Sequence, residues 1–229
     1  MHALLLLALA ATPNPQSFSF DAGAAPNVHV SDVNGSVTIE GSETGKVTVE
    51  ARQEGSAEAL ADYPVEVKQE GDTVTARLCC GPCAEKNRSC NHPPDTHFTL
   101  RVPRGARLEL SVVNAAVRVR GVSGRQEVSS VNGAVELSGS TQALKVSTVN
   151  GSVRLAPQEV ADTDVSTVAG DVKLQLPDHA SAKVDYSTVG GSFNGKSKAL
   201  GSVSRQYGAG AHDIDVSTVS GALDVEPRS

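Results

Sequence analysis

The sequence has few aromatic residues. Its 229 residues include four Phe, three Tyr and no Trp. Aromatic side chains bury the most area per residue, and a thick globular core normally contains several of them. Their scarcity predicts a thin core filled by Val, Leu, Ala and Thr. The absence of Trp excludes a Trp-lined carbohydrate platform.

An excess of positive charge is also missing. The chain carries 20 Lys and Arg against 26 Asp and Glu, a net charge of −6. Non-specific nucleic-acid binding and attraction to an anionic membrane surface both depend on clustered positive charge. We therefore expect no nucleic-acid partner and no anionic membrane surface as a partner.

The sequence contains no apolar run of the roughly 20 residues that a transmembrane helix requires, so we expect no transmembrane segment. A shorter apolar run covers residues 3–11, and Ala8-Leu9-Ala10 within it fits the small-x-small pattern of a cleavage site. This predicts a signal peptide over residues 1–10. The protein is then exported, to the periplasm, the cell surface or the medium.

One phrase recurs through the second half of the chain. It reads Val-Ser-Thr-Val-Asn-Gly-Ser-Val-Arg-Leu at 146–155, with relatives at 110–119, 128–137, 165–174, 185–193 and 216–225, and an outlying copy at 30–39. The copies between 110 and 174 are evenly spaced, and the two later spacings are longer. Self-similarity at a period of roughly 20 residues indicates stacked repeats.

The phrase is typical of β-structure, because β-branched residues alternate with polar ones. We predict an all-β fold in which residues 110–226 form a β-solenoid, a single-stranded β-helix with coils of roughly 18–21 residues. A coil of that length allows about three short strands. The alternative is an antiparallel meander in which the Asn-Gly pairs form hairpin turns.

Stacked coils place equivalent residues in columns. The alternation slips at Ser147-Thr148, which predicts a bend at that point. An amide ladder is expected from Asn114, Asn132 and Asn150. The first column predicted to stack inside is Val131, Val149, Val168, Val189 and Val219, and the second is Val117, Val135, Val153, Val172, Phe193 and Leu223.

The N-terminal part, residues 16–109, has the same β character without the regular period. Strand-like segments occur at 18–20, 28–30, 37–39, 46–50, 65–67 and 73–77, and 56–62 could form one helical turn with Ser56 as N-cap. We expect these strands to extend or cap the solenoid, since terminal units of repeat stacks shield an open edge. A separate small β-sandwich is the alternative.

Three features together resemble a known family. They are Val30-Ser-Asp-Val-Asn-Gly-Ser-Val, the segment Phe98-Thr-Leu-Arg-Val-Pro-Arg-Gly-Ala-Arg-Leu-Glu-Leu110, and the Ser-x-Val-Asn-Gly coils that follow. The chain is similar over 18–226 to the bacterial β-strand-repeat "putative adhesin" family of unknown function. The resemblance implies an exported, β-helix-like envelope protein, and it supplies no catalytic residues. The Cys-rich insertion at 79–97 departs from the family pattern.

All four cysteines lie in that insertion, at Cys79, Cys80, Cys83 and Cys90. An even number of cysteines in an exported chain favours two disulfides, for which three pairings exist. Zinc is a second interpretation, with Cys80, Cys83, Cys90 and His92 as ligands. The third is redox chemistry, because Cys80-Gly-Pro-Cys83 reproduces the thioredoxin tetrapeptide, although no helix follows that would lower a thiol pKa.

Other chemistry-bearing patterns have simpler explanations. The pairs Asp162/Asp164 and Asp213/Asp215 could bind calcium or act as acid and base, but alternating acids are typical of a solvated strand face. Ser-Thr pairs recur at 147–148, 166–167, 187–188 and 217–218, whereas nucleophilic catalysis needs one Ser beside one base. We expect no catalytic residues and no cofactor.

Three functions are compatible with these features. The favoured one is a non-enzymatic, adhesin-like solenoid that presents a repetitive polar surface to a protein or glycan of the cell surface or envelope. The second is a metal- or redox-sensing envelope protein that uses Cys79–Cys90. The third is a polysaccharide-active β-helix enzyme, which would need carboxylates and basic residues converging across neighbouring coils.

Overall fold

The computed structural model describes residues 14–85 and 89–227, and strands dominate them. The predicted helical turn is confirmed as α1 (Ala57–Ala61), where the Ser56 side chain accepts a hydrogen bond from the Ala59 N–H. The predicted signal peptide lies outside the described residues.

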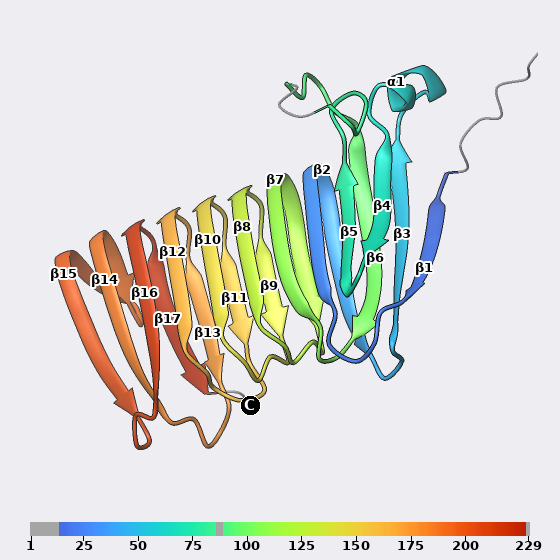
Figure 1. Ribbon diagram of the computed structural model, residues 1–229. Coiled ribbons are helices and arrows are strands. Elements are labelled where there is room, and N and C mark those ends of the chain that lie inside the picture. The colour runs from blue at the N-terminus through green and yellow to red at the C-terminus, as the bar shows by residue number, and fades with distance from the viewer. Residues whose placement is uncertain (1–13, 86–88, 228–229) are drawn as a thin grey trace, which may run out of the picture.

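The repeated phrases form units that stack side by side (Figure 1). In the central units the strands are β8 (Gln126–Asn132) and β9 (Val135–Ser138), β10 (Leu144–Asn150) and β11 (Val153–Ala156), and β12 (Thr163–Ala169) and β13 (Val172–Leu176). Successive first strands pair in parallel, so that Val146 lies beside Val128 and Val165, and successive second strands do the same. Parallel pairing makes the meander alternative wrong.

The fold is thus all-β and solenoid-like, with one large mixed sheet. Each central unit has two strands and not the expected three, because the remaining residues of the period form turns. The first strands make one row and the second strands make another. Their inward side chains share a single hydrophobic core between the two rows.

The N-terminal strands continue the same sheet. β2 (Asn27–Ser42) and β7 (Arg107–Arg120) are long strands that each supply both halves of a unit, and they pair in parallel over most of their length. On the other side of β2 lie β5 (Thr73–Leu78) and β6 (Asp95–Pro103). The antiparallel strands β1 (Gln16–Asp21), β3 (Lys46–Glu54) and β4 (Val65–Glu70) flank them and end the stack.

At the opposite end the strands do not follow chain order. The last four are β14 (Ala182–Phe193), β15 (Lys196–Tyr207), β16 (His212–Ser220) and β17 (Ala222–Pro227). β16 lies between β12 and β14 and pairs in parallel with both, while β15 forms an antiparallel hairpin with β14 (Figure 1). The long spacing between the last two phrases therefore contains the hairpin strand that covers this end.

One predicted core column is confirmed and the other is wrong. The column from Val117 to Leu223 is buried. Val149 and its equivalents Val131, Val168, Val189 and Val219 are instead between 40% and 57% exposed. Alternation continues without a slip through Ser147 and Thr148, which places Thr148 inward, and the chain bends only after it, at Val149-Asn150. The predicted bend at Ser147-Thr148 is therefore wrong as well.

Glycines allow the close approach of neighbouring units at this bend. A Cβ atom on Gly151 would lie 2.1 Å from the carbonyl oxygen of Gly133, and one on Gly170 would lie 2.1 Å from that of Gly151. Both separations are far inside van der Waals contact. A side chain at these positions would push two hydrogen-bonded units apart.

We predict that Gly151→Ala lowers the free energy of unfolding by about 1–3 kcal/mol, the usual cost of overpacking. Gly190→Ala is the matched control, because a Cβ there would meet nothing within 4 Å. Urea denaturation of both variants measures the difference. Equal stability of the two variants would contradict the close approach at the bend.

In β2, near the N-terminal end of the stack, the inward position before the bend is occupied by a carboxyl group, that of Asp32. Asp32 of β2 is in register with Val112, and its side chain is 3% exposed. Burial raises the pKa of Asp32 from 3.8 to about 7; the Val33 N–H, 2.9 Å from Oδ1, opposes the shift, and the charge of Asp95 adds to it. Oδ2 has no hydrogen-bond partner among the residues that the structure describes. Between pH 4 and pH 7, Asp32 of the folded protein therefore keeps a proton that the same group has lost in the unfolded chain.

A raised pKa of an acid makes stability fall as pH rises from the unfolded to the folded value. We expect the free energy of unfolding to decrease by roughly 4 kcal/mol between pH 4 and pH 7 through this group, and to change little through it above that range. Denaturant titrations at several pH values test this. The decrease should be much smaller in Asp32→Asn and unchanged in the exposed control Asp178→Asn; identical profiles for all three proteins would refute it.

Candidate functional site

An unbroken row of serines crosses the outer face of the first strands. Ser147 of β10 points outward, with Ser129 of β8 on one side and Ser166 of β12 on the other. The same register continues to Ser202 of β15 at one end of the sheet and to Ser31 of β2 at the other, where the next strand, β5, places Arg77 beside Ser31. In spatial order this serine row is Ser31, Ser111, Ser129, Ser147, Ser166, Ser217, Ser187 and Ser202.

A row of exposed valines runs parallel to the serines, two residues further along each strand. Val149, for example, follows Ser147 and is 41% exposed. The valine row is Val113, Val131, Val149, Val168, Val219 and Val189. Exposed apolar residues are ordinary when scattered, whereas a contiguous set marks an interaction surface.

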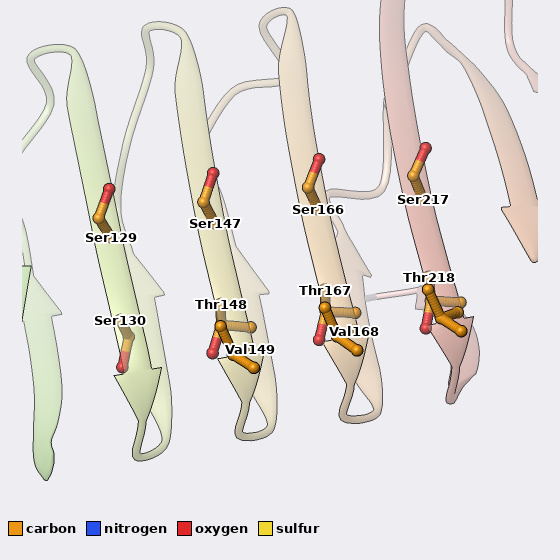
Figure 2. A pocket seen from close by; sticks show the side chains of 11 residues that line it. Ser129, Ser130, Ser147, Thr148, Val149, Ser166, Thr167, Val168, Ser217 and Thr218 are labelled. Carbon is orange, nitrogen blue, oxygen red and sulfur yellow. The ribbon is translucent and has the colours of Figure 1, made fainter. Parts of the chain in front are cut away.

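The two rows form a shallow groove of about 370 Å³ over β8, β10, β12 and β16 (Figure 2). Ser129, Ser147, Ser166 and Ser217 line it along the strands, and Val149, Val168 and Val219 lie where the strands end. We name it the serine–valine groove. Its lining offers hydroxyl groups and methyl groups at regular intervals and no titratable side chain.

Charged side chains form a third row, two residues before the serines. In spatial order the charged row is Glu127, Lys145, Asp164, Asp215 and Asp185. The Lys145 ammonium donates to the Glu127 carboxylate at 2.8 Å and lowers the pKa of Glu127. The Lys183 ammonium, 2.6 Å from the Asp185 carboxylate, lowers the pKa of Asp185. Asp164 and Asp215 form no ion pair with any residue that the structure describes.

The fold brings together the two acidic pairs singled out in the sequence. Asp162, Asp164, Asp213 and Asp215 line one hollow of about 360 Å³ beside the groove, although the two pairs lie far apart in the chain. Sequence reasoning could not find this cluster, because it depends on the insertion of β16 beside β12. No group of three or more His, Cys, Asp or Glu residues suited to a metal ion occurs within 14–85 and 89–227.

The asparagine side chains at the bend are hydrogen-bonded from unit to unit. The amide of Asn150 donates to Asn132 Oδ1 at 3.1 Å, Asn132 donates to Asn114 at 2.8 Å, and Asn114 donates to Asn34 at 3.0 Å. Asn34, from the outlying phrase at 30–39, thus extends the expected ladder by one unit. Asn34 in turn donates to the carbonyl oxygen of Pro93 at 3.0 Å. The ladder therefore ends against the cysteine-rich insertion.

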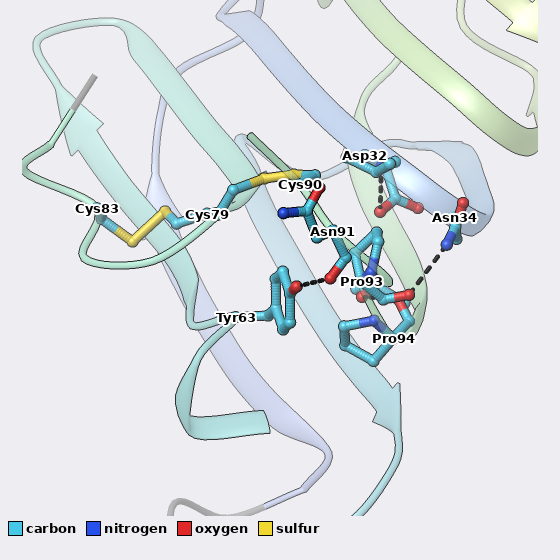
Figure 3. The surroundings of a disulfide bond; sticks show 12 residues. Asp32, Asn34, Tyr63, Cys79, Cys83, Cys90, Asn91, Pro93 and Pro94 are labelled. Atoms are coloured by element: carbon cyan, nitrogen blue, oxygen red, sulfur yellow. Dashed lines mark hydrogen bonds between the residues drawn. A yellow bond between two sulfur atoms is a disulfide. The ribbon is translucent and has the colours of Figure 1, made fainter. Parts of the chain in front are cut away.

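The four cysteines form two disulfides in the structure, Cys79–Cys83 and Cys80–Cys90 (Figure 3). Cys80 and Cys83, the two ends of the thioredoxin-like tetrapeptide, are not bonded to each other. Cys80, Cys83 and Cys90 consequently present no free thiolate beside His92 for zinc.

Hydrogen bonds from three sides hold the insertion against the end of the stack. The Tyr63 hydroxyl donates to the Asn91 carbonyl oxygen (Figure 3). The Arg77 guanidinium donates to the Cys83 carbonyl oxygen at 2.8 Å. Asn34 makes the third contact, through Pro93. The insertion is therefore held in place by hydrogen bonds to the strands and is cross-linked internally by its two disulfides.

In the described part of the chain no helix has the length and apolar character needed to cross a membrane. The only helix there, α1, has five residues.

Comparison with solved structures identifies relatives of the fold. A "putative cell adhesion protein" from Clostridium sporogenes is 14% identical, with a TM-score of 0.50, and the match covers 93% of this chain and 100% of that one. A "putative adhesin" from Bacteroides fragilis is 12% identical, with a TM-score of 0.34 and coverage of 95% and 99%. A "putative lipid binding protein" from Parabacteroides distasonis is 11% identical, with a TM-score of 0.36 and coverage of 96% and 98%. At 14% identity, the likeness to the Clostridium sporogenes protein concerns the fold alone.

No functionally curated protein matches the chain in sequence. The family profile named Toastrack DUF4097 matches residues 104–226. This range begins within the Val-Pro-Arg-Gly segment that carried the resemblance and ends with the last strand. The match extends over more than half of the 229 residues, and the protein belongs to the Toastrack DUF4097 family.

Proposed function

We propose that the protein is an exported, non-enzymatic, adhesin-like β-solenoid that binds a protein or glycan of the cell surface or envelope through the serine–valine groove. In finer terms the fold is a β-helix whose central coils hold two strands each. The continuity of the serine and valine rows is the observation that carries the proposal.

The serine and valine rows continue through the part of the sheet in which the strands are not in chain order. β16 is inserted before β14 in space, yet Ser217 and Val219 occupy the same two columns as Ser187 and Val189. Residues at exposed positions of a strand are not required to be apolar by the core. A repeating apolar row on the outside is therefore better explained by contact with a partner than by folding.

The uniformity of the groove supports a binding function without turnover. Catalysis by serine depends on one hydroxyl that a nearby base activates. Ser129, Ser147, Ser166 and Ser217 occupy equivalent register positions, and the groove lining contains no histidine. The hydroxyl of Ser166 contacts Asp164 at 3.5 Å and that of Ser217 contacts Ser187 at 3.1 Å, so neither has a basic group beside it that is set apart from the repeat. Repetition instead suits many weak contacts made at once, whose joint strength exceeds that of each contact.

Export is supported by the two disulfides and by the apolar run at residues 3–11. Disulfides form and persist mainly in oxidising compartments. The adhesion role attributed to the Clostridium sporogenes protein belongs to the same class of function.

Intact mass spectrometry of the exported protein tests the compartment and the cysteine chemistry together. We expect a chain that starts near Ala11, is four hydrogens lighter than the reduced form, resists alkylation and contains no metal. In Cys90→Ser the single alkylated residue should be Cys80. Four free thiols, or a zinc ion lost on denaturation, would instead favour metal or redox sensing by the cysteine cluster.

Binding to intact cells or isolated envelopes tests the groove itself. Ser147→Arg combined with Ser166→Arg fills the groove and should remove most of the retained protein in a sedimentation assay. The matched control is Gln142→Arg with Gln158→Arg, which adds the same charge at exposed turns of adjacent units and should bind like the wild type.

Two results would count against the proposal. Equal retention of the groove variant and its control would show that another surface binds. Release of reducing ends from a panel of envelope glycans would replace a binding function with that of a polysaccharide-active enzyme.

A further inference from the structure

We infer that the ligand of the serine–valine groove is a cationic amphipathic helix, lying across the strands with its apolar stripe on the valine row and its Lys or Arg residues on the charged row. This inference rests on the proposed function, because it names the chemistry of the partner for the same groove. It follows from three properties of the face: its width, its period and its charge.

The width of the face fits a helix. The charged row and the valine row are four positions apart on every strand, as in Lys145 and Val149 or Asp164 and Val168. At about 3.3 Å per residue, the two rows are separated by about 13 Å. An α-helix with its side chains is about 10–12 Å across. The serine row between them has the short side chains that leave room for such a cylinder.

The period of the face also fits. Neighbouring strands lie about 4.8 Å apart, so the valines recur at that interval along the rod. One turn of an α-helix rises about 5.4 Å, and its apolar residues at i, i+3, i+4 and i+7 recur nearly once per turn. The six valines span about 24 Å and therefore face between four and five helical turns, which a peptide of about 20 residues covers with a margin at its ends.

The negative charge of the face selects a helix that carries positive charge. Six carboxylates lie in the charged row and the adjoining hollow, against the three cations Arg125, Lys145 and Lys183. Asp164, Asp213 and Asp215 form no ion pair with any residue in the described ranges. A second copy of this chain would bring carboxylates against carboxylates, and an anionic polymer would be repelled. A cationic stripe beside an apolar one complements the face.

The test uses the disulfide-intact protein and a fluorescent Leu/Lys peptide of about 20 residues, designed as an amphipathic helix. Fluorescence anisotropy measures binding, with three comparison probes: the same residues in scrambled order, a Leu/Glu version, and a linear neutral oligosaccharide. We expect the Leu/Lys helix to bind and the others to bind at least tenfold more weakly. Its affinity should fall as salt rises, because exposed charges are screened.

Two double variants locate the site. Asp164→Asn with Asp215→Asn should weaken binding about fivefold and flatten its salt dependence. Val149→Ser with Val168→Ser should weaken it about tenfold and leave the salt dependence unchanged. Glu159→Gln with Asp178→Asn removes the same charge as the first variant at exposed turns and should bind like the wild type. Melting temperatures confirm that each variant is folded.

The other outcomes are equally specific. The inference is wrong if the scrambled peptide binds as well as the helix, or if the turn control weakens binding as much as the groove variants. Binding of the oligosaccharide in place of the peptide also overturns it. If no probe binds while the wild-type protein is still retained on envelopes and the groove variant is not, the groove function stands and only the helical ligand is rejected.

Discussion

Parallel, in-register pairing between neighbouring units is the constraint on which the rest of the structure depends. It places each residue beside its equivalent at the spacing of hydrogen-bonded strands, so identical side chains form columns. Columns dominated by Val and Leu fill the thin core of the central units. The three buried aromatics of the described residues, Phe98, Tyr186 and Phe193, lie near the two ends of the stack, where the regular columns stop.

The same register generates the outer surface. A repeat that keeps its core in columns necessarily places its outward residues in columns too, and the serine, valine and charged rows follow. At the bend, the glycines let neighbouring backbones approach, and the asparagine amides satisfy one another from unit to unit. The core, the bend and the groove all result from parallel, in-register pairing, which acts on different positions of the same repeated phrase.

The sequence predicts the β-class, the repeat period, the asparagine column and the N-terminal strands, because each depends on local pattern. It misplaces the valine column, since a bend one or two positions later reverses the side to which Val149 points. It does not reveal that β16 lies beside β12, because a longer spacing between phrases does not say where the extra strand goes. The acidic hollow depends on the placement of β16 beside β12, so the sequence does not reveal it either. The sequence also leaves three cysteine pairings open, because pairing depends on how the loop folds.

The position of β16 and β17 between earlier strands has a consequence for how the rod is completed. A ribosome or a translocon delivers β14 and β15 first, yet their place in the stack is defined only when the later strands have filled the gap. The last four strands, about a fifth of the chain, therefore pair out of chain order, which raises the contact order of this end of the stack and is expected to slow its folding. Once closed, β16 is held on both sides, by β12 and β14, so tension on the C-terminal strands must shear two parallel ladders together. Under tension, β16 should therefore be among the strands that are hardest to pull out of the sheet.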